Sequence, residues 1–82
     1  MSTLEIDVGD LHARSVEFTA TEVVVTLADG RRIATPLEWY PRLKRASTAQ
    51  RANFEVMPMG IHWPDIDEDL SIAGMLKGRR GA

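Results

Sequence analysis

The sequence predicts a small α+β domain, with a three- to four-stranded antiparallel sheet and two or three short helices. The first third of the chain alternates apolar and polar residues, as strands do. Asp29-Gly30 separates two such runs, which is a strong β-hairpin signal. After Pro36 the pattern changes, and the residues STAQ at 47–50 form a capping-box pattern that indicates a helix start.

Three strands are expected in the first half of the chain, near residues 14–19, 22–28 and 31–36. In the second of them, Val23, Val25 and Leu27 share one face because side chains alternate along a strand. We expect that face to contact the core. The residues FEVM at 54–57 have β character and supply the fourth strand.

Pro41 sets the next boundary, because proline lacks an amide hydrogen and clashes with a preceding helical turn. Residues 37–40 are therefore expected to form a short turn, and a helix should begin with Pro41 in its first turn. A second short helix should follow the capping pattern. A third is expected over residues 72–77, with Ser71 as its cap and Gly78 as its stop.

The composition fits one small globular domain over residues 1–82. The chain has 82 residues, of which 44% are hydrophobic, and it contains no cysteine. So small a domain has little room for an enclosed substrate pocket. No stretch approaches the roughly 18 apolar residues of a membrane span, and the acidic start does not resemble a signal peptide. We expect a cytoplasmic protein that is not an enzyme, uses no cofactor and ends in a frayed basic tail at 78–82.

Charge is unevenly distributed, although the formal net charge is only -2. Residues 31–51 contain six basic side chains and one acidic side chain, whereas residues 65–69 contain four acidic side chains and no basic one. This pattern favours a local polar surface for a partner. The alternative is that the basic and acidic segments face each other or water.

The stretch GIHWPDIDEDLS (60–71) does not fit a metal-binding loop. Asp65, Asp67 and Asp69 match the opening of an EF-hand loop, but the required glycine and glutamate are replaced by Leu70 and Leu76. The two histidines lie fifty positions apart, at 12 and 62, which is no recognised spacing for a transition metal. We therefore expect no metal site.

A divided role is expected for this stretch instead. Its apolar side chains should anchor it to the core: Ile61, Trp63 and Ile66. Its acids should present charge outward, near the basic helix or to a partner: Asp65, Asp67 and Glu68. Asp67 to Asp69 also precede the expected last helix, where negative charge is favoured by about 0.3–1 kcal/mol per residue.

The chain resembles the bacterial and phage family catalogued as domain of unknown function 2442. The family pattern runs DGR, then PL-x-W-(F/Y)-PRL, then an alanine before a Thr/Gln-Arg segment, then GIHWP-x-(I/L)-DED-(I/L)-S. Here it is matched by DGR at 29–31, PLEWYPRL at 36–43, Ala46, Arg51 and GIHWPDIDEDLS at 60–71. The resemblance covers about residues 14–77. The residues PM at 58–59, directly before GIHWP, differ from the glycine-rich segment that usually stands there in such proteins.

The resemblance implies a small α+β domain that often lies beside a second small protein, of the family catalogued as domain of unknown function 4160. That arrangement looks like a toxin–antitoxin pair. We therefore expect an antitoxin-like, protein-binding domain whose partner is another small protein. Some relatives carry an added helix-turn-helix segment, so a nucleic-acid-binding or transcription-regulatory accessory role is the alternative. Phage members also leave open an inhibitor of a host defence system.

The expected partner-binding residues come from both charged segments, because tryptophan and arginine most often carry interface energy. On the basic side they are Trp39, Arg42 and Arg51. On the acidic side they are His62, Trp63, Asp65, Asp67, Glu68 and Asp69. The alternative is that both tryptophans lie in the core and that both arginines form internal salt bridges to the acids.

Overall fold

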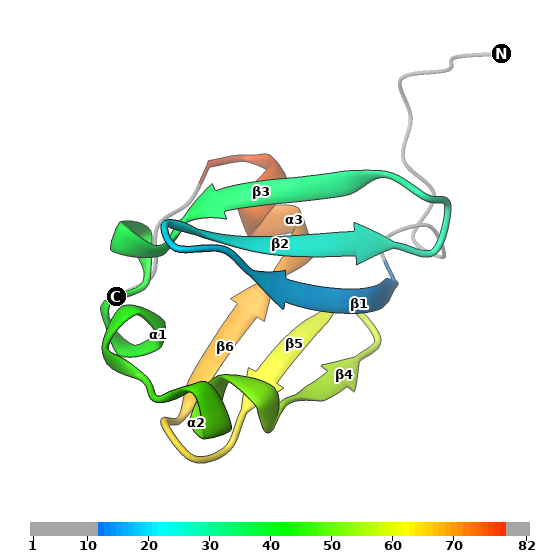
Figure 1. The fold of residues 1–82 in the computed structure, drawn as a ribbon. Coiled ribbons are helices and arrows are strands. Elements are labelled where there is room, and N and C mark those ends of the chain that lie inside the picture. Colours follow the sequence, from blue (N-terminus) through cyan, green and yellow to red (C-terminus); the bar gives the residue numbers. More distant parts are fainter. Residues whose placement is uncertain (1–11, 79–82) are drawn as a thin grey trace, which may run out of the picture.

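The computed structural model describes residues 12–78 and contains two three-stranded antiparallel sheets (Figure 1). The first sheet, in the order β1-β2-β3, comprises β1 (Ala13–Phe18), β2 (Glu22–Leu27) and β3 (Arg32–Pro36). The second, in the order β4-β5-β6, comprises β4 (Glu55–Met57), β5 (Gly60–Trp63) and β6 (Glu68–Ser71). The predicted α+β class is confirmed. The basic tail expected at 78–82 lies outside the described residues apart from Gly78.

Short helices connect and follow the strands. They are the 3-10 helix η2 (Leu37–Trp39), α1 (Pro41–Arg45), α2 (Thr48–Ala52) and α3 (Ile72–Leu76). Pro41 occupies the first turn of α1. Ser47 and Gln50 form both hydrogen bonds of a capping box, and the Ser71 hydroxyl accepts one from the Gly74 N–H at 3.1 Å. The predicted helix starts are therefore confirmed. No helix within residues 12–78 is long and apolar enough to cross a membrane.

The hairpin between β2 and β3 has a three-residue loop. The Gly30 N–H donates to the Leu27 carbonyl at 2.9 Å, and the Leu27 N–H donates to the Arg31 carbonyl at 2.7 Å. This is the pattern of a type I turn followed by a bulge at glycine. Only Gly30 in the loop has a positive φ, 95°. Asp29 accepts hydrogen bonds from the Arg31 side chain and backbone, and these lower the pKa of its carboxyl.

Replacing Gly30 with valine should lower the free energy of unfolding by about 1 kcal/mol or more, because β-branched residues rarely adopt positive φ. Steric overlap is not the cause, since a Cβ at Gly30 would meet no heavy atom within 4 Å. Gly30→Asn is the control, because asparagine tolerates left-handed backbone and should recover most of the loss. An unchanged denaturation midpoint for Gly30→Val would contradict this reading of the turn.

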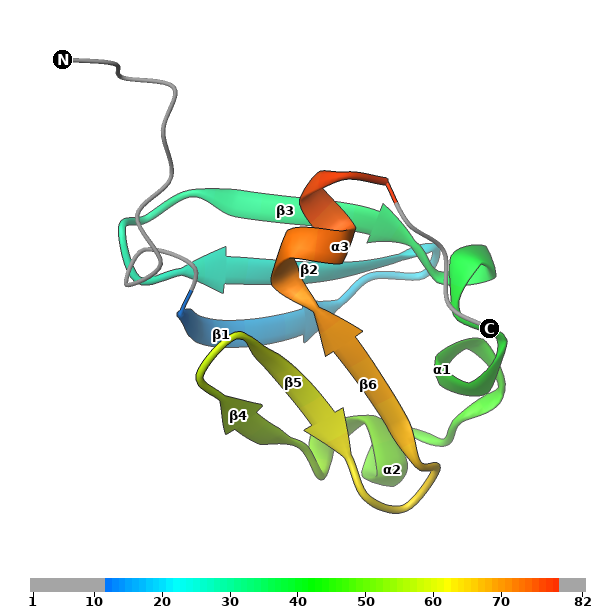
Figure 2. The same cartoon turned by 180° about the vertical axis from the view of Figure 1, so that it is seen from behind.

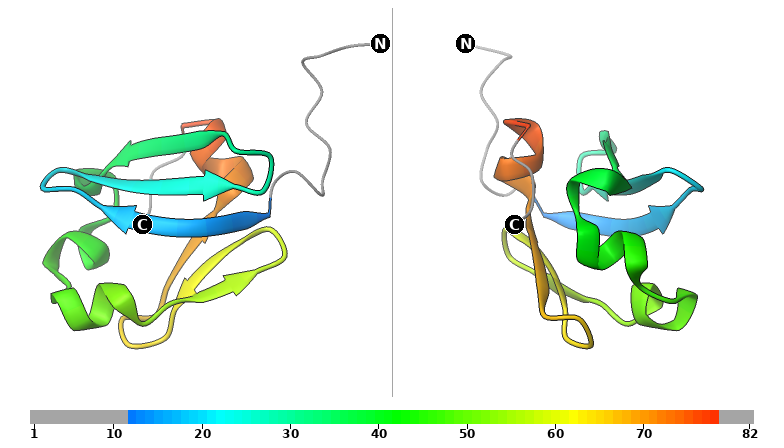
Figure 3. Two further views of the ribbon diagram at one scale, coloured as in Figure 1. Left: turned by 45° about the vertical axis from the view of Figure 1, so that its right-hand side comes forward. Right: turned by 90° about the vertical axis from the view of Figure 1, so that its left-hand side faces the viewer.

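The core lies between the two sheets and beneath α3. The predicted inward face of β2 is confirmed, since Val23, Val25 and Leu27 are at most 1% exposed. β5 and β6 cross at an angle to the first sheet, and β6 leads into α3, which packs over the back of that sheet (Figure 2). α1 and α2 gather at one end of both sheets (Figure 3).

Residues 60–71, for which the sequence predicted no strand, form a β-hairpin. β5 and β6 pair from Gly60 opposite Ser71 to Trp63 opposite Glu68. The expectation that Asp67 to Asp69 directly precede a helix is wrong, because β6 stands between Asp67 and α3. The strand signal is weak because one inward position of β6 is Glu68, which interrupts the alternation of apolar and polar residues.

Candidate functional site

The hairpin loop 64–67 is attached to the helices through polar contacts. Arg42 donates from Nη1 to the backbone carbonyl of Asp67 at 2.6 Å, and Asn53 donates from Nδ2 to the Asp65 carboxylate at 3.0 Å. Asp67 has a φ of 51°, a conformation that aspartate and asparagine tolerate better than most residues. Within residues 12–78 no ion pair joins the basic segment to the acidic one, so the internal salt-bridge alternative does not hold.

Trp63 is a core residue and not a surface contact. Its exposed fraction is 0%, and its ring lies 6.2 Å from those of Phe18 and Phe54 between centroids. The indole Nε1 donates to the Arg51 carbonyl at 3.0 Å, which joins β5 to the end of α2. The predicted anchoring role is confirmed, whereas burial excludes Trp63 from the expected partner surface.

Glu68 was expected to face outward, and it is buried. It is only 7% exposed because β6 places it on the inward face, opposite Trp63. Its Oε1 accepts from the Asp69 N–H at 3.3 Å, and its Oε2 has no hydrogen-bond partner among residues 12–78. The buried Tyr40 hydroxyl also has no partner in that range. The charge of Glu68 acts on the Tyr40 hydroxyl, so these two buried polar groups are neighbours in the core.

Burial raises the pKa of the Tyr40 hydroxyl. The neighbouring Thr35 hydroxyl opposes this rise, although the two groups lack the geometry of a hydrogen bond, and the nearby charge of Glu68 adds to it. Since the folded-state pKa is raised, the unfolded chain loses this proton at a lower pH than the folded chain. Tyr40 thus contributes stability that is fully present below the ordinary pKa of 10.0 and is lost as pH rises through the folded-state value.

Stability should accordingly fall above about pH 10, the ordinary tyrosine pKa. Tyr40 is the only tyrosine, so tyrosinate absorbance reports on this residue alone. Tyr40→Phe should remove the tyrosine part of the alkaline loss in stability. It should cost little stability at neutral pH, because the hydroxyl has no hydrogen-bond partner among residues 12–78. Titration of Tyr40 in the folded protein at its ordinary pKa would contradict this expectation.

His62 and Asp69 lie on the outer face of the second sheet. They are cross-strand neighbours, with Nδ1 and Oδ1 2.6 Å apart, and the Asp69 side chain is 75% exposed. Glu55 faces His62 from the neighbouring strand β4. Within the described part of the chain, no group of three or more histidine or acidic side chains is placed to hold a metal ion.

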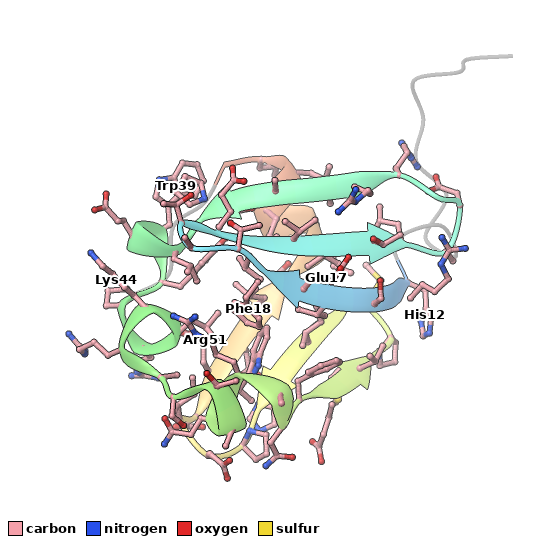
Figure 4. All side chains as sticks on the ribbon, viewed as in Figure 1. His12, Glu17, Phe18, Trp39, Lys44 and Arg51 are labelled. Atoms are coloured by element: carbon pink, nitrogen blue, oxygen red, sulfur yellow. The ribbon has the colours of Figure 1, made fainter. Side chains whose placement is uncertain are left out.

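Two open hollows meet at Arg51. One, of about 400 Å³, runs along β1 and α2, and its lining includes Val16, Phe18, Thr48 and Phe54. The other, of about 490 Å³, lies between the turn after β1 and the helices, and its lining includes Thr21, Leu37, Glu38 and Lys44. Arg51 lines both hollows, and Figure 4 shows it beside Phe18 and below Lys44.

The Arg51 guanidinium is fixed in position from three sides. Nε donates to the Leu43 carbonyl at 3.0 Å and Nη2 to the Lys44 carbonyl at 3.1 Å, so Arg51 caps the end of α1. Its Cζ lies 5.1 Å from the centroid of the Phe18 ring. Within residues 12–78, the other N–H groups of the guanidinium have no hydrogen-bond acceptor, and no carboxylate forms an ion pair with it.

The nine predicted partner-binding residues are not gathered on one surface. Trp63 and Glu68 are buried, Trp39 is partly buried, and His62 and Asp69 occupy the outer sheet face. The remaining acids belong to the hairpin loop near Arg42. The sequence identified Arg51 but not its neighbour Phe18. The alternating pattern around Phe18 predicted a strand and gave no indication of the hollow beside it.

The double change Asp65→Asn with Asp67→Asn should alter the free energy of unfolding by less than about 1 kcal/mol, because both side chains are exposed. The Asp67 contact to Arg42 uses a backbone carbonyl, and asparagine also adopts positive φ. Chemical denaturation measures this change. Unfolding of the double variant would show that these carboxylates hold the fold together.

A protein family described as protein of unknown function (DUF2442) matches residues 13–81. An uncharacterized protein of Chromobacterium violaceum, CV0863, has a similar structure, with a TM-score of 0.73 and 28% identity over 87% of this chain and 69% of that one. A protein of unknown function from Rhodospirillum rubrum is also similar, with a TM-score of 0.71 and 29% identity over 87% of this chain and 90% of that one. No curated protein matches the chain. The match over nearly all described residues shows that this chain belongs to the DUF2442 family.

Proposed function

We propose that this chain is a protein-binding domain, the antitoxin-like half of a two-gene module. The observation that supports the proposal is the Arg51 site, where two open hollows meet at a partly exposed guanidinium that has no ion-pair partner in residues 12–78. A partly buried cation without a counter-ion favours a ligand that supplies one. Arginine beside an aromatic ring is also a frequent centre of protein interfaces.

A nucleic-acid-binding role is the second candidate, and the helices give it little support. α1 and α2 have five residues each, so each is about 7.5 Å long, which is short for a recognition helix. Arg42 and Arg51 also donate hydrogen bonds to backbone carbonyls of this chain, which leaves fewer N–H groups for phosphates. A mobility-shift assay with duplex DNA at low and high salt tests this candidate, because phosphate contacts weaken steeply with salt.

The protein-binding proposal is tested by expressing the neighbouring reading frame alone and together with this chain. Expression alone should arrest growth, and co-expression should restore growth and yield a complex that survives size-exclusion chromatography. Absence of a complex when both proteins are soluble would overturn the protein-binding role. A complex without growth arrest would overturn only the antitoxin-like part.

A further inference from the structure

We propose that the partner enters as an extended segment that pairs with the free edge of β1 and places an acidic side chain on Arg51. This inference rests on the proposed protein-binding function and names the chemistry of the partner. It combines three observations: an edge of β1 that no strand within residues 12–78 pairs with, a hollow lined in part by apolar side chains along that edge, and a guanidinium at the end of the hollow with donors that no described residue uses.

The hydrogen-bond pattern of β1 shows which backbone groups are available. The Thr19 N–H donates to the Glu22 carbonyl at 2.9 Å, and bonded pairs alternate with unbonded pairs along antiparallel strands. The backbone groups of Val16 and Phe18 therefore point away from β2. β1 is the end strand of its sheet, and within residues 12–78 only β2 pairs with it. Such an edge is a template for an added strand.

The hollow follows the edge of β1 over enough residues to hold a short extended segment. Residues 16–19 all line it, which corresponds to about 13 Å of extended chain. α2 and Phe54 form the opposite wall. A strand added here would lie between β1 and α2, with alternate side chains directed toward the apolar rings and toward solvent.

The charges favour an acidic segment over a basic or neutral one. Glu17 and Glu38, the carboxylates that line the hollows, already pair with Arg32 at 3.7 Å and with Lys44 at 3.4 Å. Arg51 lacks such a pair in the described chain, and its hydrogen bonds to α1 hold the guanidinium in place before a ligand arrives. A glutamate or aspartate of the partner would form charge-assisted hydrogen bonds with the unused N–H groups.

The test is a nuclear magnetic resonance titration of the full chain, labelled with nitrogen-15, with two blocked peptides, TVEVT and TVQVT. At up to about 5 mM peptide, which detects millimolar affinity, the acidic peptide should shift the Val16 and Phe18 amide signals and the Arg51 Nε signal. The glutamine peptide should bind about tenfold more weakly, because it lacks the charge. Arg51→Gln should abolish this difference, and Arg45→Gln, a charge-matched change on exposed α1 surface, should leave it intact.

Several results would overturn the inference. They are the absence of shifts at β1 with either peptide, equal affinity for both peptides, and slow exchange of the Val16 and Phe18 amides in the free protein. Slow exchange would mean that another segment of this chain, or a second copy, already covers the edge, and a dependence on protein concentration would identify the second copy. If Arg51→Gln does not fold, the comparison of the two peptides on the unaltered chain still tests the inference. A folded Arg51→Gln variant that keeps the partner would refute this surface while leaving the protein-binding function intact.

Discussion

Trp63→Ala is expected to unfold the domain or to lower its free energy of unfolding by about 3–5 kcal/mol, the usual loss for a buried aromatic residue. Trp63 is fully buried and contacts Phe18 from the first sheet and Phe54 from the second half of the chain. Removing the indole would leave a cavity where β1, β5 and α2 meet. Urea denaturation measured by circular dichroism gives the change directly.

Trp63→Phe is the matched control. It keeps an aromatic ring in the core but loses the N–H that donates to the Arg51 carbonyl. The expected loss is about 1–3 kcal/mol, from the unpaired carbonyl and the smaller ring. A loss below about 1 kcal/mol for Trp63→Ala would contradict the placement of this side chain at the centre of the core.

Gly60→Ala is expected to be the second most damaging change, with a loss of about 3 kcal/mol or more. A Cβ at Gly60 would lie 2.2 Å from the Leu70 carbonyl oxygen on the paired strand β6. The obstacle is backbone, so rotation of a side chain does not relieve it. β5 and β6 would have to separate where the hairpin meets the core.

Gly30→Ala separates this effect from the general cost of replacing glycine. Position 30 has open space and a φ of 95°, so alanine there meets only backbone strain of about 1–2 kcal/mol. Gly60→Ala should therefore be clearly more destabilising than Gly30→Ala in the same denaturation assay. Equal or reversed losses would mean that β5 and β6 do not approach as closely as described.

The first sheet and the helix starts were predictable because their signals are local. Gly30 in the hairpin, Pro41 at the start of α1 and the Ser47 capping box each specify the backbone within a few residues. In the second sheet only β4 was predicted, at residues 54–57, and it was expected to join the first sheet as a fourth strand. β5 and β6 were not predicted, because each has only four residues and one inward position of β6 holds Glu68, which breaks the alternation that identifies a strand.

The candidate site was less predictable because it depends on contacts between distant segments. Arg51 lies more than thirty positions from Phe18 in the sequence, yet its guanidinium sits over that ring. The charge of the acidic stretch predicted a partner surface. In the structure, however, Gly60, Trp63 and Asp67 have roles in packing or backbone conformation. The fold thus explains most of the GIHWPDIDED stretch, and we propose that the partner binds at Arg51 instead.

Capture of the proposed partner, the product of a neighbouring gene, by two variants of this chain tests this proposal most directly. One is Arg51→Gln, and the other is the double change Asp65→Asn with Asp67→Asn, with folding of both verified by circular dichroism. We predict that the double variant, here called the hairpin variant because both changes lie in the loop 64–67, retains the partner and that Arg51→Gln loses it. Retention by Arg51→Gln together with loss by the hairpin variant would contradict the account and would place the partner surface on the acidic loop.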